Sequence, residues 1–168
     1  MTELSIEFRQ ADDSDWDAIW PTVVSTLRAG DTYPYPPETT ESEGRVIWFG
    51  SNEPSRVVYV AESGEEVVAT AYLKPNQPGL GDHIANAGWI VKESFRGRGL
   101  GRAFATYVLE EASRLGYRGM QFNAVVATNK AAIALWRSMG FEVIGTVPRA
   151  FRHPDEGMVA MLVMYRDL

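Results

Sequence analysis

A chain of 168 residues, 45% hydrophobic and 23% charged, has the length and composition of one globular domain with a sizeable core. Its net charge of −6 argues against nucleic acid as a partner, and the absence of cysteine excludes disulfides and thiolate metal sites. No apolar run approaches the roughly 20 residues that span a bilayer, and the acidic N-terminus does not resemble a signal peptide. We therefore expect a soluble, cytoplasmic single domain over residues 1–168, with no metal, nucleic-acid or membrane partner.

The N-terminal residues predict a strand followed by a helix. Ser5–Gln10 alternates apolar and polar residues, as half-buried strands do. Residues 12–14 supply N-cap side chains, after which apolar residues recur at helical spacing as far as Leu27, and Gly30 ends the pattern. Pro21 lies inside this helix, so we expect the helix to kink or restart there.

A loop, a second helix and a hairpin follow. The proline-rich segment 31–37 predicts an ordered or lid-like loop, and a short helix is expected over about Thr39–Gly50. Strands are expected over Arg56–Glu62 and Glu66–Lys74, because the Ser63–Glu65 segment between them is typical of a hairpin turn.

The middle of the chain predicts a loop, a strand and an amphipathic helix. Residues 75–81 read as the loop and Ile84–Val91 as the strand, and a glycine-rich turn separates that strand from the helix. Gly116 stands at the stop position of the helix. The apolar face of the helix is predicted to contain Phe104, Val108, Ala112 and Leu115.

The C-terminal part predicts a strand, a short helix and two further strands. Met120–Val126 is the first strand, and Thr128 is a candidate cap for a helix that ends at Gly140. Phe141–Val147 and Met158–Tyr165 are the last two strands. The order βααβββαβαββ predicts an α/β domain with a mixed sheet.

Charge is distributed unevenly along the chain. Residues 1–66 contain 14 acidic residues against 4 Lys or Arg, whereas residues 67–168 contain 12 Lys or Arg against 8 acidic residues. Most such asymmetry reflects a solvated surface. Four cations, however, lie close together in an otherwise acidic protein, at Lys92, Arg96, Arg98 and Arg102, which indicates an anion site.

The segment Arg96–Gly101 reads Arg-Gly-Arg-Gly-Leu-Gly and lies directly between a strand and a helix. Glycine lets the backbone turn sharply and approach a ligand, and the helix start offers unpaired N–H groups to a pyrophosphate. A Walker loop would end in Gly-Lys-Ser/Thr, but this chain reads Gly-Arg-Ala at 101–103. A Rossmann fingerprint from Gly97 would need a glycine where Arg102 stands.

At these residues the chain resembles the GNAT superfamily of N-acetyltransferases. The coenzyme-A loop of that family, Arg/Gln-x-x-Gly-x-Gly/Ala, is matched by Arg96, Gly99 and Gly101. A second signature, an Asn that opens a short helix ending in an aromatic residue and then Gly-Phe, is matched by Asn129–Phe141. The resemblance covers essentially the whole chain and implies a mixed, mostly antiparallel sheet of about seven strands flanked by four helices.

The resemblance also implies a cofactor and the residues that bind it. Acetyl-CoA would be the acetyl donor, and Asn129 would bind the pantetheine arm or lie near the sulfur. The strand around Trp89, Ile90 and Val91 would splay from its neighbour, bind pantetheine and offer a donor to the thioester carbonyl. Backbone amides would bind the pyrophosphate at Arg96, Gly97, Arg98, Gly99, Leu100, Gly101 and Arg102.

Two positions depart from the common pattern of the family. Many relatives have tyrosine where this chain has Trp136, and an indole N–H cannot protonate the leaving thiolate as a phenol can. Packing under the coenzyme or in the core is therefore the expected role of Trp136. The strand Ile84–Val91 contains no carboxylate, so a common position for the general base is vacant.

Asn86 and Asn123 are polar amides on apolar strands, so each is either satisfied in the core or faces a ligand. Their contexts, with Thr-Asn129 and the tail 145–154, resemble a subgroup that acetylates proline analogues such as azetidine-2-carboxylate. We hypothesise that both amides face the acceptor and are catalytic. Tyr33 and Tyr35 lie in the loop that covers the acceptor in this family, and acceptor contact and loop packing remain equally open.

The sequence thus predicts acetyl transfer from acetyl-CoA to a small-molecule amine, an amino or imino acid, by direct attack in a ternary complex. His83 and His153 are the only histidines, and a surface role is expected for both rather than a role as base. A non-catalytic CoA-binding module, and acetylation of a protein N-terminus or lysine, remain as alternatives. Members of the family often form homodimers, but the sequence contains no interface signal.

Overall fold

Seven strands form one sheet in the order β1-β2-β3-β4-β5-β7-β6. The computed structural model describes residues 5–168, so residues 1–4, on which part of the signal-peptide argument rests, lie outside it. All neighbouring strands pair antiparallel except β4 and β5. The strands are β1 (Ile6–Gln10), β2 (Val57–Ser63), β3 (Glu66–Pro75), β4 (Ile84–Val91), β5 (Gly119–Val126), β6 (Glu142–His153) and β7 (Gly157–Asp167).

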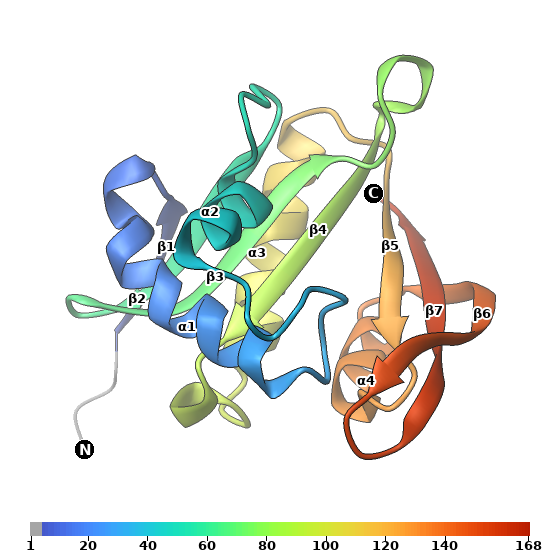
Figure 1. Ribbon diagram of the computed structural model, residues 1–168. Coiled ribbons are helices and arrows are strands. Elements are labelled where there is room, and N and C mark those ends of the chain that lie inside the picture. The colour runs from blue at the N-terminus through green and yellow to red at the C-terminus, as the bar shows by residue number, and fades with distance from the viewer. Residues whose placement is uncertain (1–4) are drawn as a thin grey trace.

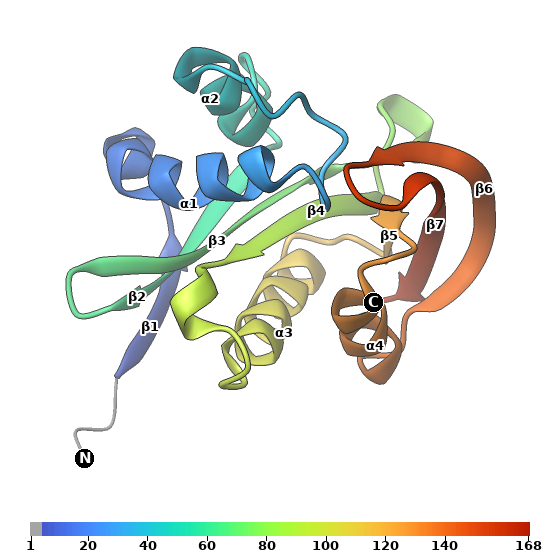
Figure 2. The same cartoon turned by 60° about the horizontal axis from the view of Figure 1, so that its bottom comes forward.

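The helices cover both faces of the sheet. Helices α1 and α2 lie on one face, and α3 and α4 lie on the other (Figure 1, Figure 2). Their bounds are α1 (Trp16–Ala29), α2 (Glu41–Phe49), α3 (Leu100–Arg114) and α4 (Lys130–Ser138). Within residues 5–168, none of these helices is long and apolar enough to cross a membrane. The expected fold class, with its seven strands, four helices and element order, is confirmed.

Three local predictions differ from the structure. Pro21 neither ends nor restarts α1, because the apolar face of this helix is buried, with Ile19 and Val23 0% exposed. Strands β6 and β7 are longer than predicted, because β6 is the edge strand and tolerates Pro148 without losing a ladder partner. Leu115 is 47% exposed, because it is the residue that follows the last turn of α3.

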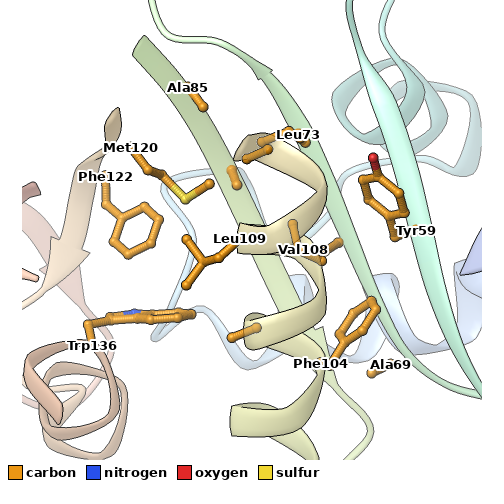
Figure 3. Packing of buried hydrophobic residues seen from close by; sticks show 14 of the residues in the cluster. Tyr59, Ala69, Leu73, Ala85, Phe104, Val108, Leu109, Met120, Phe122 and Trp136 are labelled. Atoms are coloured by element: carbon orange, nitrogen blue, oxygen red, sulfur yellow. The ribbon is translucent and has the colours of Figure 1, made fainter. Parts of the chain in front are cut away.

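The larger of two hydrophobic clusters packs α3 and α4 against the sheet (Figure 3). Phe104 and Val108 of α3 are 0% exposed and lie over β2 and β3, beside Tyr59. Trp136 of α4 packs on Phe122 of β5, with 4.8 Å between the ring centroids. This cluster packs β5 and α4 against the rest of the molecule.

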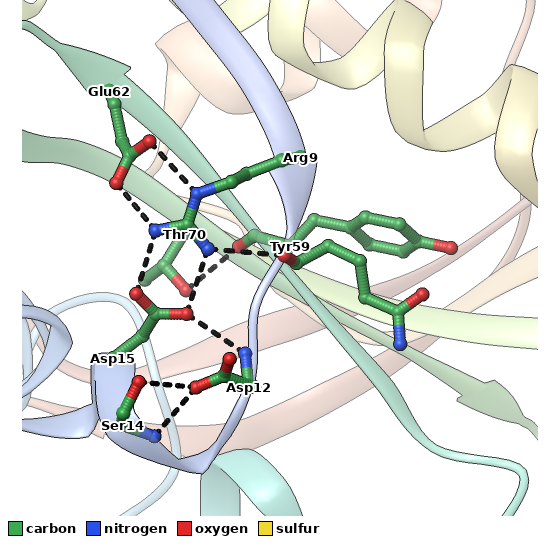
Figure 4. A network of polar contacts seen from close by, with 8 residues as sticks. Arg9, Asp12, Ser14, Asp15, Tyr59, Glu62 and Thr70 are labelled. Carbon is green, nitrogen blue, oxygen red and sulfur yellow. Dashed lines mark hydrogen bonds and ion pairs between the residues drawn. The ribbon is translucent and has the colours of Figure 1, made fainter.

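The first strand is joined to α1 by a network of ion pairs around Arg9 (Figure 4). The Arg9 guanidinium donates to both oxygens of Asp15, at 2.7 and 2.9 Å, and to both oxygens of Glu62, at 2.6 and 2.9 Å. Asp12 and Asp15 form a reciprocal capping box around the 3₁₀ turn Asp13–Asp15 that precedes α1. The network therefore fixes the start of α1 against β1 and β2.

Candidate active site

Strands β4 and β5 separate soon after they begin. They pair in parallel only at Ile84 with Gly119 and at Ala85 with Met120. Beyond that point β4 stays in register with β3 as far as Val91, whereas β5 stays paired with β7 and has an irregular register between Phe122 and Val125. Each strand thus follows its antiparallel partner, and β4 and β5 diverge. The α1–α2 loop lies in front of the wedge-shaped space between these two strands (Figure 1).

The side chain of Asn86 bridges the point where the two strands part. Its Nδ2 donates to the backbone carbonyl of Gln121 on β5, at 2.9 Å. Asn86 is 9% exposed, and within residues 5–168 its Oδ1 accepts no hydrogen bond. The sequence left open whether this amide is satisfied in the core or faces a ligand, and both descriptions apply. Its Nδ2 bonds to a strand of the sheet, and the residue also lines a cavity.

Ladder geometry fixes which backbone groups of β4 face the wedge. The Lys92 N–H donates to the Val68 carbonyl and the Asn76 N–H to the Ile84 carbonyl, both at 2.8 Å. Because hydrogen-bonded residues alternate along an antiparallel strand, the even-numbered residues of β4 pair with β3. The odd-numbered residues, Trp89 among them, therefore direct their N–H and C=O groups toward β5.

Two of these carbonyls accept hydrogen bonds from side chains. The Tyr33 hydroxyl donates to the Trp89 carbonyl at 3.0 Å, and Arg96 Nε donates to the Val91 carbonyl at 3.1 Å. The N–H groups of Trp89 and Val91 point into the wedge beside these occupied carbonyls. The strand thus presents backbone N–H donors to a ligand in the wedge.

A groove of about 1260 Å³ runs along this side of β4 toward the start of α3. Its walls come from α1, the α1–α2 loop, the end of β4 and the loop that follows it, the start of α4 and the β6–β7 turn. Its charged side chains are the cations Lys92, Arg96 and Lys130 and the carboxylates Asp31, Glu93 and Glu156. Gly97 and Gly99 have φ values of +74° and +81°, which favour glycine, and no atom lies within 4 Å of where a Cβ would stand on either. The residues present therefore leave room for a phosphate-bearing ligand close to the backbone.

Helix α3 begins at Leu100 without a side-chain cap. Its first internal hydrogen bond runs from the Ala103 N–H to the Gly99 carbonyl, at 3.1 Å. The N–H groups of the first turn thus have no partner within the helix, and the positive end of the helix dipole lies there. Arg98 lies over the Phe95 ring, and Arg102 donates to Ser138 on α4, so neither side chain is among those that line the groove.

A second cavity, of about 300 Å³, lies beside the groove and shares Thr32, Trp89, Asn129 and Ala132 with it. The predicted residues that it brings together are Tyr33, Tyr35, Asn86, Trp89, Asn123, Asn129 and Trp136. Among the described residues that line it there is no Asp, Glu or His, and Lys74 is the one charged side chain.

Three tyrosines line the cavity wall beneath α1 and α2. Burial is the main cause that raises the pKa of Tyr33, Tyr35 and Tyr72 above the ordinary value. All three phenols are therefore protonated near neutral pH, and they can donate hydrogen bonds but cannot serve as bases. The rings of Tyr33 and Tyr35 stack at 6.4 Å between centroids.

The side chains of Asn123, Asn129 and Trp136, which the sequence also singled out, lie in different environments. Asn123 is exposed at the β5 irregularity, and its Nδ2 donates to Asn76 at 2.7 Å while its Oδ1 accepts from Gln121. Asn129, and not Thr128, caps α4, because its Oδ1 accepts from the Ala132 N–H at 3.2 Å. Trp136 is 8% exposed and its ring lies 4.9 Å from that of Trp89.

The two histidines lie apart from the small cavity. His83 is exposed before β4 and lines neither cavity. His153 lines the groove, where its Nδ1 accepts from the N–H groups of Asp155 and Glu156 at 3.2 Å each.

Sequence reasoning missed Lys74 and Lys130. Lys130 lies in the signature helix, where the family resemblance assigned roles to Asn129 and Trp136 but none to the lysine, and its Nζ donates to the Ala127 carbonyl at 2.7 Å. Lys74 stands at the end of a strand, and only its register against β4 reveals that it faces the cavity.

The comparisons with known proteins agree with this geometry. Residues 20–141 match the model of the acetyltransferase (GNAT) family. The chain belongs to the GNAT family of acetyltransferases. It is therefore an acyltransferase. The structure of yncA from Salmonella typhimurium, which shares this fold at 23% identity and a TM-score of 0.84, was solved with acetyl-CoA.

Several relatives resemble this acetyltransferase over most of its length. The structure of a GCN5-related N-acetyltransferase from Kribbella flavida is 44% identical, with a TM-score of 0.90 over 97% of this chain and 98% of that one. N-acetyltransferase aca1 of Schizosaccharomyces pombe is 31% identical over 75% of this chain, which spans 66% of that protein's length. YwnH of Bacillus subtilis, provisionally named a phosphinothricin acetyltransferase, is 31% identical over 76% of each chain.

Proposed function

We propose that this GNAT acetyltransferase, acting as one domain over residues 1–168, transfers the acetyl group of acetyl-CoA to the nitrogen of a small amino or imino acid. The observation that supports this proposal is the cavity of about 300 Å³ that joins the groove beside the splayed strands and contains no acidic or histidine side chain among the described residues. A cavity of this size suits a small molecule rather than a folded protein surface.

The proposed reaction is a direct attack in a ternary complex. The acceptor nitrogen forms a bond to the thioester carbonyl carbon, the carbon–sulfur bond breaks, and the coenzyme leaves as a thiolate. The proton released by the nitrogen balances the proton that the thiolate gains. The N–H groups of Trp89 and Val91 both face the wedge but lie about 6.6 Å apart along the strand, so one of them would stabilise the oxyanion and the other would bind pantetheine.

The donor would lie in the groove, with its pyrophosphate at the glycine-rich loop. Backbone amides from Arg96 to Arg102 and the open end of α3 supply the donors for it. Pantetheine would lie along Trp89, Ile90 and Val91 as far as Asn129, which lines both cavities.

No acidic or histidine side chain among the described cavity residues can take the proton of the acceptor, so the attacking nitrogen must be present in its neutral form. The α-amino group at a peptide N-terminus has a pKa near 7.8, but the nitrogen of a free amino or imino acid is more basic and closer to a lysine side chain, so pKa alone does not choose between these acceptors. The provisional name of YwnH favours an amino acid, since phosphinothricin is one. Imino acids such as azetidine-2-carboxylate belong to the same acceptor class.

An acceptor screen tests the proposal. Purified protein and acetyl-CoA are mixed with amino acids, imino acids, simple amines and lysine peptides, and the released thiol is measured. We expect turnover with one or more amino or imino acids and none with lysine peptides. Turnover with lysine peptides alone, or no turnover with any small amine, would refute the proposal.

A further inference from the structure

Lys74 is a cation that faces the small cavity without a protein partner. It stands near the end of β3, is half-buried, and lines the cavity. Within residues 5–168 its Nζ forms neither an ion pair nor a hydrogen bond, whereas its backbone belongs to the β3–β4 ladder. The cations that do form ion pairs with carboxylates in the structure are Arg9, Arg45, Arg56, Lys92 and Arg114.

The register of the sheet places Lys74 directly opposite Asn86. These two residues pair across β3 and β4, and the next pair on the same face is Tyr72 with Gly88. Side chains that are opposite in an antiparallel pair project from the same face, with Cβ atoms about 5 Å apart. Lys74 and Asn86 therefore approach the cavity side by side, beneath the loop that contains Tyr33 and Tyr35.

The two side chains offer complementary chemistry. Asn86 Nδ2 is engaged by the Gln121 carbonyl, so its Oδ1 is the atom left to accept a hydrogen bond from an N–H group. Lys74 offers an ammonium group, and no carboxylate among the described cavity residues competes for it. An amine nitrogen and a carboxylate joined through one carbon match this pair.

We propose that Lys74 binds the carboxylate of the acceptor and makes the enzyme selective for amines that bear an anionic group. This inference rests on the proposed acetylation of amino or imino acids. A charge-assisted hydrogen bond in a partly buried site is stronger than a neutral one, so the carboxylate contributes to both affinity and orientation. Cationic acceptors such as diamines and lysine peptides meet the same charge and are disfavoured.

The test compares proline with prolinamide, which keeps the ring amine and lacks the carboxylate. For wild type and variant, kcat/KM is measured with each acceptor. The variant's kcat/KM is divided by the wild-type value for the same acceptor, so the difference in amine pKa between proline and prolinamide cancels. The two ratios are then compared. Lys74→Gln should lower kcat/KM for proline roughly 10- to 100-fold, mainly through KM, and change that for prolinamide less than about threefold. Lys74→Arg should recover most of the activity toward proline.

Controls distinguish the charge at this position from general effects. Arg114→Gln removes an exposed cation of the same charge that lines neither cavity, and both ratios should remain unchanged. CoA-induced shifts in melting temperature show that each variant is folded and binds the donor.

Each outcome has one meaning. An equal loss for proline and prolinamide, or no loss for either, overturns the role of Lys74 while acetylation of small amines stands. A wild-type enzyme that acetylates prolinamide but not proline has the same meaning. If the wild type acetylates no small amine, both this inference and the proposed function fail.

Discussion

Asn86 donates a hydrogen bond from Nδ2 to the carbonyl of Gln121, at 2.9 Å, across the point where β4 and β5 part. This bond links two strands whose ladder ends one residue earlier, at Ala85 and Met120. The side chain thus replaces the backbone pairing at the mouth of the wedge and also lines the cavity of about 300 Å³.

Asn86→Ala should therefore reduce both stability and turnover. Loss of the partner for the Gln121 carbonyl should lower the free energy of unfolding by about 1–3 kcal/mol, and loss of an acceptor contact should reduce kcat/KM roughly 30- to 1000-fold. Asn123→Ala is the matched variant. Asn123 is exposed and both its amide atoms already bond to protein groups, so a loss of less than about tenfold is expected. Unchanged turnover per folded Asn86→Ala molecule would show that Asn86 is structural only.

Gly99→Glu should abolish binding of CoA. Any side chain at this position has a strained φ of +81°, so Gly99→Ala should cost about 1–2 kcal/mol of stability and still bind the coenzyme. Glutamate adds a negative charge at the start of α3, where the pyrophosphate is expected. The measurement is the rise in melting temperature with added CoA, with Gly64→Glu as control because Gly64 also has a positive φ and lies in the β2–β3 turn. A folded Gly99→Glu protein that binds CoA normally would exclude this loop as the pyrophosphate site.

Tyr33→Phe removes the hydroxyl that joins the α1–α2 loop to the Trp89 carbonyl. We expect KM for the acceptor to rise about 3- to 10-fold, because the loop loses one hydrogen bond of about 1 kcal/mol at the cavity wall. Tyr35→Phe is the control, since the described residues offer its hydroxyl no hydrogen bond, and KM should change less than twofold. Steady-state kinetics with acetyl-CoA saturating separates the two, and equal effects would argue against a specific role for the Tyr33 hydroxyl.

Trp136→Phe should keep most of the activity. The indole is 8% exposed and packs against Trp89 and Phe122, so its replacement by a smaller ring should lower stability by about 1–2 kcal/mol and kcat by less than about tenfold. Trp136→Tyr should not increase kcat greatly, although it restores a phenol. Loss of kcat beyond about 100-fold in the Phe variant would instead indicate that the indole N–H assists the leaving thiolate.

Stability should fall at acid pH through Asp15. Hydrogen bonds from Arg9 hold the pKa of the Asp15 carboxyl below its ordinary value of 3.8. A lowered pKa in the folded state stabilises the protein above the unfolded value, and this contribution is lost as the pH falls below it. Denaturant unfolding from pH 7 to pH 3 should show a smaller loss for Asp15→Asn than for the wild type. Asp155→Asn, which removes an exposed carboxylate, should retain the wild-type slope.

The sequence alone predicted the glycine-rich turn before α3, the short helix α4 and the order of elements, and the structure contains all three. Glycine spacing at Gly97–Gly101, the helix stop at Gly140 and the alternation of strands are local patterns, because they depend on backbone freedom and on which face of an element is apolar. Such patterns can be recognised without knowing which elements are neighbours. The family and the acetyl donor followed from them.

Register and long-range pairing decided which residues line the cavity of about 300 Å³. That Lys74 stands opposite Asn86, and that Tyr33 reaches the Trp89 carbonyl, depends on contacts between residues far apart in the chain. A shift of one residue in the β3–β4 register would turn Lys74 to the other face of the sheet. No local pattern specifies that register, because it is set by packing of both sheet faces at once. The placement of a lysine in the cavity therefore exists only in the folded protein.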